Sequence, residues 1–153
     1  MANKPFIIKR HESDGFTLSD RVAIKVRFNE SDPLGIVWHG HYLRYFEDGR
    51  ESFGEKYGLR YLDFYKMGYI VPIVSLNCNY KKTLKYGDTA IVETTFRDSP
   101  AAKIHFHFRL YKPDSAELIA EGSSVQVFLN AKNMQLQLTI PDFFEKWKIK
   151  HRP

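Results

Sequence analysis

A carboxylate lies just ahead of a predicted helix in segment 28–58, which reads FNESDPLGIVWHGHYLRYFEDGRESFGEKYG. Asp32 precedes Pro33 in a polar turn, where an Asp side chain commonly bonds nearby backbone amides and is purely structural. The helix that follows, near His39 to His41, has no Ser, Thr, Asp or Asn at its immediate start to cap its first amides. Free amides there would stabilise an oxyanion, and an ionised Asp could attack a carbonyl or activate water. This pattern predicts an acyl-transfer site.

The elements that must position this site follow from hydrophobic periodicity. Strands are predicted over 21–28, 70–80, 89–96, 103–111 and 118–129, and helices over 41–57 and 141–148. In the first strand, Val22, Ile24, Val26 and Phe28 should share one face. Gly49 lies on the apolar stripe of the long helix, where it would let the helix approach a sheet closely, and Gly58 suits the helix C-terminus. The order predicts an α+β fold, with one antiparallel sheet and a helix on one face.

Composition restricts the class of protein. The 153 residues are expected to form a single domain over 21–153, preceded by an N-terminal arm over 1–20. No apolar run reaches 18 residues and no signal peptide is evident, which predicts a cytoplasmic protein without a membrane partner. The net charge of +5 favours anionic partners. The basic residues are dispersed, however, which argues against nucleic acid.

Two histidine pairs could be mistaken for metal ligands, His39 with His41 and His105 with His107. Neither pair is completed by a Cys/His set at zinc spacing, so no metal is expected. The single cysteine, Cys78, lies among strand residues and is expected to be a packed small side chain.

The stretch from Asp32 to Trp38, followed by His39-Gly40-His41-Tyr42, resembles the signature of the hotdog-fold acyl-CoA thioesterases, and most closely the 4-hydroxybenzoyl-CoA thioesterase type. Residues 72–77, 86–88, 127–128 and 140–141 match the same pattern more weakly, so the resemblance covers most of the chain from Val22 to Trp147. It implies a sheet of about five strands wrapped around one long helix. It also implies homodimers or homotetramers with active sites at the subunit interface and no cofactor.

The resemblance implies roles for individual residues. Asp32 would be the catalytic carboxylate, as nucleophile or general base, and His39 would bind the thioester carbonyl through its backbone amide, whatever its side chain does. The substrate-binding residues would be Trp38, Gly40, Val74 and Ser75. Candidate contacts to the CoA phosphates are Lys81, Lys82, Arg97 and Lys103.

The resemblance leaves the CoA contacts and the reaction open. Relatives hold the nucleotide with arginines after the third strand, whereas the loop here, RDSPAAK over 97–103, keeps only its first and last residues basic. Carboxylates on the long helix act as the base in other hotdog enzymes, although Glu47 and Glu51 are expected on its solvent face. The chain could also be a hotdog-fold dehydratase or a non-catalytic acyl-CoA-binding protein. The acyl group cannot be assigned from these residues.

Overall fold

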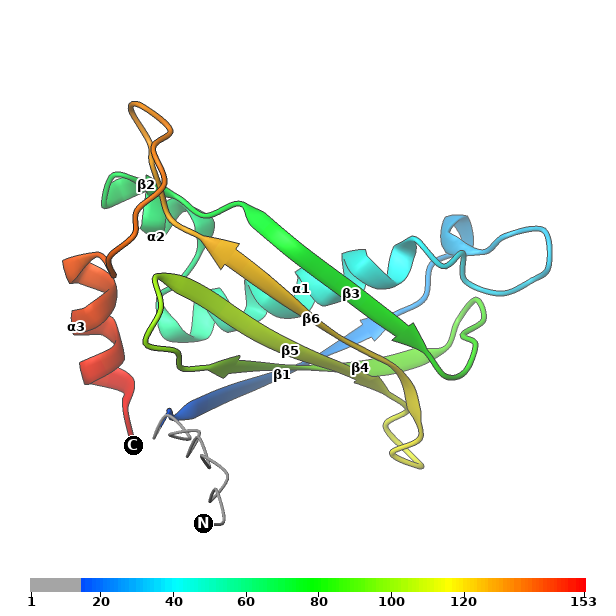
Figure 1. Cartoon of the computed structure of the whole chain (residues 1–153). Coiled ribbons are helices and arrows are strands. Elements are labelled where there is room, and N and C mark those ends of the chain that lie inside the picture. Colours follow the sequence, from blue (N-terminus) through cyan, green and yellow to red (C-terminus); the bar gives the residue numbers. More distant parts are fainter. Residues whose placement is uncertain (1–14) are drawn as a thin grey trace, which may run out of the picture.

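A five-stranded antiparallel sheet curves around one long helix (Figure 1). The computed structural model describes residues 15–153. The strands are β1 (Thr17–Lys25), β3 (Ile73–Tyr80), β4 (Thr89–Arg97), β5 (Lys103–Tyr111) and β6 (Leu118–Val127). Their order in the sheet is β1-β4-β5-β6-β3, with every neighbour antiparallel. The predicted α+β architecture is therefore confirmed, and β1 and β3 are the edges of the sheet.

The helix α1 (His41–Tyr57) lies against the concave face of this sheet (Figure 1). Its apolar stripe buries aromatic rings against those of the sheet, as where Phe46 stacks on Phe108 with centroids 4.9 Å apart. Gly49 fits the predicted close approach, because a Cβ there would lie 2.5 Å from both Val92 and Thr94 of β4. The predicted C-cap is also present, since Gly58 has the left-handed φ of 73°.

Smaller elements close the two ends of the molecule. They are the 3₁₀ turn η1 (Phe28–Glu30), the helices α2 (Tyr61–Lys66) and α3 (Asp142–His151), and the two-residue strands β2 (Tyr69–Ile70) and β7 (Leu129–Asn130). The indole N–H of Trp147 donates to the carbonyl of Tyr57 at 2.7 Å, which ties α3 to the last turn of α1. The buried ammonium of Lys148 pairs with Asp98 at 2.7 Å, which ties α3 to the β4–β5 loop. No helix in residues 15–153 is long and apolar enough to cross a membrane.

The boundaries predicted for the first strand were wrong. β1 begins at Thr17 and ends at Lys25, so residues 17–20 of the predicted arm are paired with β4, while residues 1–14 lie outside the described part. Phe28 does not share the buried face of Val22, because the chain turns into η1 and leaves the Phe28 ring 78% exposed.

The strand predicted over 70–80 is divided into β2 and β3. Pro72 has no N–H to donate to a ladder, and the register between β3 and β6 shifts between Ile73 and Ser75, which leaves Val74 in a bulge. The strand predicted to reach residue 129 likewise divides into β6 and β7. The short C-terminal helix is confirmed and continues to His151.

Candidate active site

The loop before α1 is a tight hairpin that projects from one end of the molecule (Figure 1). Asp32 N–H donates to the carbonyl of Ile36 at 2.8 Å, and Gly35 N–H returns to the carbonyl of Asp32 at 3.0 Å. Gly35 has a φ of 79°, which is the region that favours glycine. Trp38 N–H then donates to the carbonyl of Glu30 at 3.0 Å, so the two arms of the loop run side by side into the helix.

The Asp32 side chain is half-buried and has a structural contact of its own. Its Oδ1 accepts a hydrogen bond from Leu34 N–H at 2.8 Å, which is the turn-forming role considered above. Among residues 15–153, no hydrogen-bond donor is assigned to Oδ2. One oxygen therefore orients the carboxylate while the other is available for chemistry.

The start of α1 has unused backbone donors. Gly40 is the N-cap and provides no side-chain cap. In the described part of the chain, neither His39 N–H nor Gly40 N–H donates to another group. Amides at a helix N-terminus carry partial positive charge, so these two could hold a developing oxyanion. Sequence reasoning expected such a donor at His39, and its role toward a substrate stays a prediction.

Trp38 and Gly40, which are predicted to bind substrate, lie together at the helix start. The indole ring of Trp38 packs beside His39, with centroids 4.9 Å apart, and over the backbone of Gly40. A Cβ at position 40 would collide with this ring, so glycine is needed while Trp38 keeps that position. Both Trp38 and His39 are exposed in the single chain.

Val74 and Ser75 lie on β3, at the open edge of the sheet, and both are exposed. Their neighbours Ile73 and Leu76 line a narrow hollow between α1 and β3, of about 20 Å³, which is room for one water molecule. The fully buried guanidinium of Arg50 borders this hollow, and its Nη2 has no partner among the described residues.

The four candidate CoA-phosphate residues do not form one group within the chain. All four are exposed. Lys81 and Lys82 follow β3 at the end of the sheet nearest the Asp32 loop. Arg97 and Lys103 flank the β4–β5 loop at the opposite end, where Lys148 of α3 bonds Asp98 and Ser99. A single chain cannot bring both pairs to one nucleotide.

The helix carboxylates differ from each other. Glu51 is exposed, as expected, whereas Glu47 is half-buried and borders the hollow beside Tyr61. Burial, with a contribution from Glu47, raises the pKa of Tyr61 to about 12. No cluster of three or more His, Cys, Asp or Glu residues suited to a metal occurs in the described chain.

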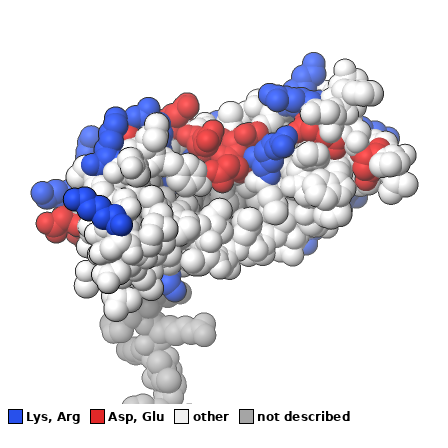
Figure 2. All heavy atoms as spheres, turned by 90° about the horizontal axis from the view of Figure 1, so that it is seen from above, with Lys and Arg blue, Asp and Glu red and all other residues white. Residues whose placement is uncertain are grey.

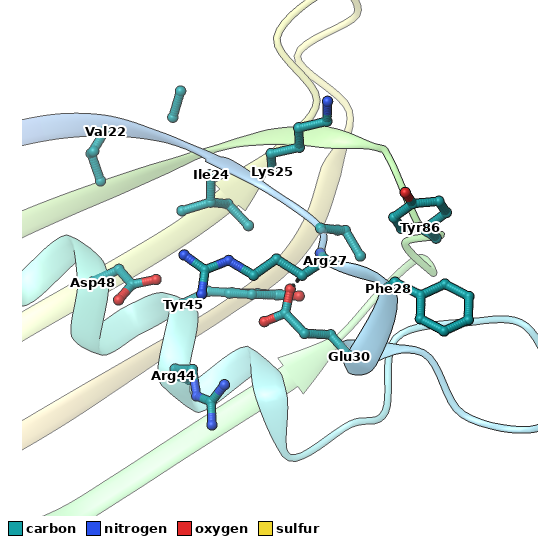
Figure 3. A pocket seen from close by; sticks show the side chains of 12 residues that line it. Val22, Ile24, Lys25, Arg27, Phe28, Glu30, Arg44, Tyr45, Asp48 and Tyr86 are labelled. Atoms are coloured by element: carbon teal, nitrogen blue, oxygen red, sulfur yellow. Dashed lines mark hydrogen bonds between the residues drawn. The ribbon is translucent and has the colours of Figure 1, made fainter.

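A wide hollow lies beside α1, and Asp32 is not among the residues that line it. It has a volume of about 690 Å³ and lies between β1 and α1 (Figure 3). Lys25, Arg27 and Arg44 surround it together with Glu30 and Asp48, and burial raises the pKa of Asp48. His39 does not line it either, so this hollow is not formed by the candidate catalytic residues.

The charged residues do not form a continuous basic stripe on the face seen in Figure 2. Acidic side chains gather in the middle of that face, with Lys and Arg in separate groups around them. This distribution offers no extended track for a nucleic-acid backbone on that side of the molecule.

A five-stranded antiparallel sheet wrapped around one long helix is the hotdog fold. The model of the Thioesterase-like superfamily matches residues 26–148, and the chain belongs to that family. A Bacillus subtilis protein, YneP, which is named as a provisional acyl-CoA thioesterase, is 35% identical over 131 residues, covering 82% of this chain and 94% of YneP.

Two further relatives are named for aromatic thioesters. The solved DHNA-CoA thioesterase of Staphylococcus aureus is 26% identical, covers 86% of this chain and 90% of its own, and superposes with a TM-score of 0.75. The 4-hydroxybenzoyl-CoA thioesterase of Pseudomonas sp. is 26% identical over 110 residues, covering 68% of this chain and 78% of the relative. The predicted hotdog-fold thioesterase family is confirmed.

Tyr80 was missed by sequence reasoning. Its hydroxyl donates to the carbonyl of His39 at 2.8 Å. The two residues are far apart in the chain, and no local pattern signals their contact. Alternation in β3 could only have placed Tyr80 on the face that carries Cys78.

Proposed function

We propose that this protein hydrolyses acyl-CoA thioesters, with Asp32 as the catalytic carboxylate and the start of α1 as the oxyanion site. The observation that carries the proposal is the unused pair of amides at His39 and Gly40, on the loop that also holds Asp32. The family membership supports thioester hydrolysis as the reaction.

In the reaction, the thioester carbonyl oxygen accepts a hydrogen bond from His39 N–H, which polarises the acyl carbon. The free oxygen of Asp32 then either attacks that carbon or removes a proton from a water that attacks it. Negative charge moves onto the carbonyl oxygen and is stabilised by the helix amides. When the tetrahedral intermediate collapses, the C–S bond breaks and CoA leaves as a thiolate, which takes up a proton. In the nucleophilic route, water then hydrolyses the resulting anhydride.

The active unit of the proposal is a homodimer or homotetramer, with the site at the subunit interface. Trp38 and His39 are exposed in the single chain and Asp32 is half-buried. β3 exposes Ile73, Val74 and Leu76 along the sheet edge. Two β3 edges side by side would cover these apolar side chains and continue the sheet. A second subunit could also supply the basic residues that one chain holds at the far end of its sheet.

Asp32→Asn is the decisive variant. Asparagine keeps an oxygen for the Leu34 amide but is a poor nucleophile and base, so turnover should fall by about 10³-fold or more while the fold is retained. Release of CoA thiol, followed with a thiol reagent, measures turnover, and circular dichroism checks the fold.

Asp88→Asn is the matched control, because Asp88 also sits in a turn and accepts a hydrogen bond from a backbone amide, Lys85 N–H, at 2.9 Å. It should keep wild-type turnover. If Asp32→Asn also keeps it, Asp32 is not part of the mechanism.

The acyl group is to be found with a panel of aryl-, short-chain and long-chain acyl-CoAs. Free thiol must appear for a thioesterase, whereas a dehydratase releases none. Tight acyl-CoA binding without thiol release would instead identify a non-catalytic binding protein. A burst of thiol equal to one per site, ahead of the free acid, would select the anhydride route over base-activated water.

A further inference from the structure

The last residue of β3 is tied to the peptide that leads into α1. Tyr80 donates its hydroxyl to the carbonyl of His39 at 2.8 Å. The Tyr80 ring also packs edge-on against the buried ring of Tyr42, with centroids 5.0 Å apart, and against His39, at 6.4 Å. The hydroxyl is therefore held in place by a ring that has its own packing partners.

The geometry of a peptide unit makes this bond consequential. The described chain has no cis peptide, and in a trans peptide the C=O and N–H point in opposite directions. A bond that holds the carbonyl of His39 toward Tyr80 therefore aims Gly40 N–H away from it. His41 N–H holds the carbonyl of Trp38 in the same way at 3.0 Å, which orients His39 N–H. His39 N–H and Gly40 N–H, the two unused donors, thus each belong to a peptide whose carbonyl accepts a hydrogen bond.

We propose that Tyr80 is a positioning residue for the oxyanion site. It fixes the His39–Gly40 peptide, so that Gly40 N–H acts as a second donor beside His39 N–H. The inference rests on the proposed thioester hydrolysis and assigns to that site a residue and a second donor. Tyr80 touches neither the thioester nor the attacking group and works through the peptide it holds.

The chemistry of the phenol suits this role. Burial, and secondarily the neighbouring Cys78 thiol, raises the pKa of Tyr80 above its ordinary value near 10. The hydroxyl is therefore protonated and able to donate at neutral pH. Hydrogen bonding at the carbonyl of a peptide also polarises its N–H, which makes Gly40 a stronger donor.

Tyr80→Phe removes this hydroxyl and leaves the ring contact with Tyr42. We expect kcat for thiol release to fall about tenfold, the loss typical of one well-placed hydrogen bond. KM should stay within about twofold, because the bond to the oxyanion strengthens only in the transition state. Tyr86→Phe is the control, since Tyr86 is exposed and its hydroxyl has no hydrogen-bond partner among residues 15–153; it should leave both constants unchanged.

A spectroscopic readout separates positioning from a structural role. An acyl-CoA with a ¹³C-labelled thioester carbonyl is bound to the Asp32→Asn variant, and its C=O stretch is recorded by infrared difference spectroscopy. Two oriented donors should lower that frequency relative to free acyl-CoA, and adding Tyr80→Phe should reverse part of the shift. Thermal unfolding should stay within about 2 °C of the parent.

An unchanged kcat, or a lower kcat with an unchanged carbonyl frequency, overturns the role of Tyr80 while thioester hydrolysis stands. If wild-type protein releases no thiol from any acyl-CoA in the panel, the proposed function fails instead. The inference would fall with it, because no oxyanion would then form at the helix start.

Discussion

The two edge strands of the sheet are finished in different ways. On β1, side chains of α1 reach the backbone of the edge, because Tyr57 donates its hydroxyl to the carbonyl of Ser19 at 2.9 Å. Ser52 donates to the carboxylate of the next residue, Asp20, at 2.6 Å. On β3, no side chain of the described residues bonds the backbone from Ile73 to Tyr80.

The side chains differ in the same sense. The outward face of β1 is polar or small, and Arg21 pairs with Glu93 of β4 at 2.7 Å. The outward face of β3 is polar as well, through Asn77 and Asn79. Its bulge, however, leaves Val74 58% exposed, and its inward side leaves Leu76 39% exposed beside α1. An edge that is bonded and charged resists strand addition, and an edge that is open and apolar invites it. The contrast teaches that β1 is a boundary of the molecule, whereas β3 is the surface where the proposed second subunit would pair.

Among the tests of the contrast between the two edges, the largest loss of assembly and turnover should come from a charge placed on the β3 edge. Leu76→Lys would oppose buried ammonium groups across the proposed interface, so we expect the complex to dissociate to the 18.0 kDa chain. Thiol release should fall at least about 100-fold, because each site would lose its second subunit. Multi-angle light scattering and the thiol assay measure the two outcomes.

Ala23→Lys adds the same charge on the outward face of β1 and should alter neither mass nor turnover. Because Leu76 also lines the hollow beside α1, circular dichroism should show that Leu76→Lys keeps its fold. A wild-type protein that runs only as an 18.0 kDa species would contradict the interface site and remove the contrast between the edges.

A core substitution on the closed edge should cost stability without affecting assembly. Ile24 points inward from β1 and is almost fully buried. Ile24→Ala should lower the free energy of unfolding by about 2–4 kcal/mol through lost burial and a cavity. Urea denaturation measures the cost, and light scattering should show an unchanged mass. The outward neighbour provides the control, since Ala23→Ser should stay within about 0.5 kcal/mol. A loss of assembly in Ile24→Ala would show that the two edges are not independent.

The smallest expected effect is a change in how stability depends on pH, and it arises on the sheet face between the two edges. There His107 lies near Glu121. Its strand neighbours are Thr95 and Ser123. Burial, with a contribution from the positive charge of Arg97, lowers the pKa of His107. The unfolded chain, with a His pKa near 6.5, therefore takes up a proton first as the pH falls. Stability should drop as the pH decreases below about 6.5.

His107→Gln should reduce this drop, measured as the thermal midpoint between pH 7 and pH 5. His105, whose pKa is also lowered by burial, should retain part of it. Ser123→Ala removes a neighbour that does not titrate, so it should leave the pH slope unchanged. An equal slope in His107→Gln would mean that His107 is not the group responsible.

Local patterns in the sequence were enough to predict the structural features that depend only on residues close together in the chain. The uncapped helix start, the close-packing role of Gly49 and the C-cap at Gly58 all follow from residue type and spacing. The full extent of β1 did not, because Ser19 and Asp20 carry no strand signal and are ordered by pairing with β4 and by side chains of α1. The bond from Tyr80 to His39 spans 41 residues and exists only once the sheet has folded around the helix.

The open β3 edge also matters during the interval between folding of one chain and its assembly with another. A chain that has folded but not yet met a partner exposes an apolar strand, and such edges can accept wrong partners as readily as the right one. Correct pairing would depend on the square of the chain concentration, and so would the competing first step of aggregation. Pro72 and the bulge at Val74 shorten the regular stretch available to a wrong strand. Unfolding of an unpaired chain is first order and competes with pairing at low concentration, whereas growth of an aggregate beyond two chains adds further encounters at high concentration. Refolding yield should therefore have an optimum at an intermediate concentration.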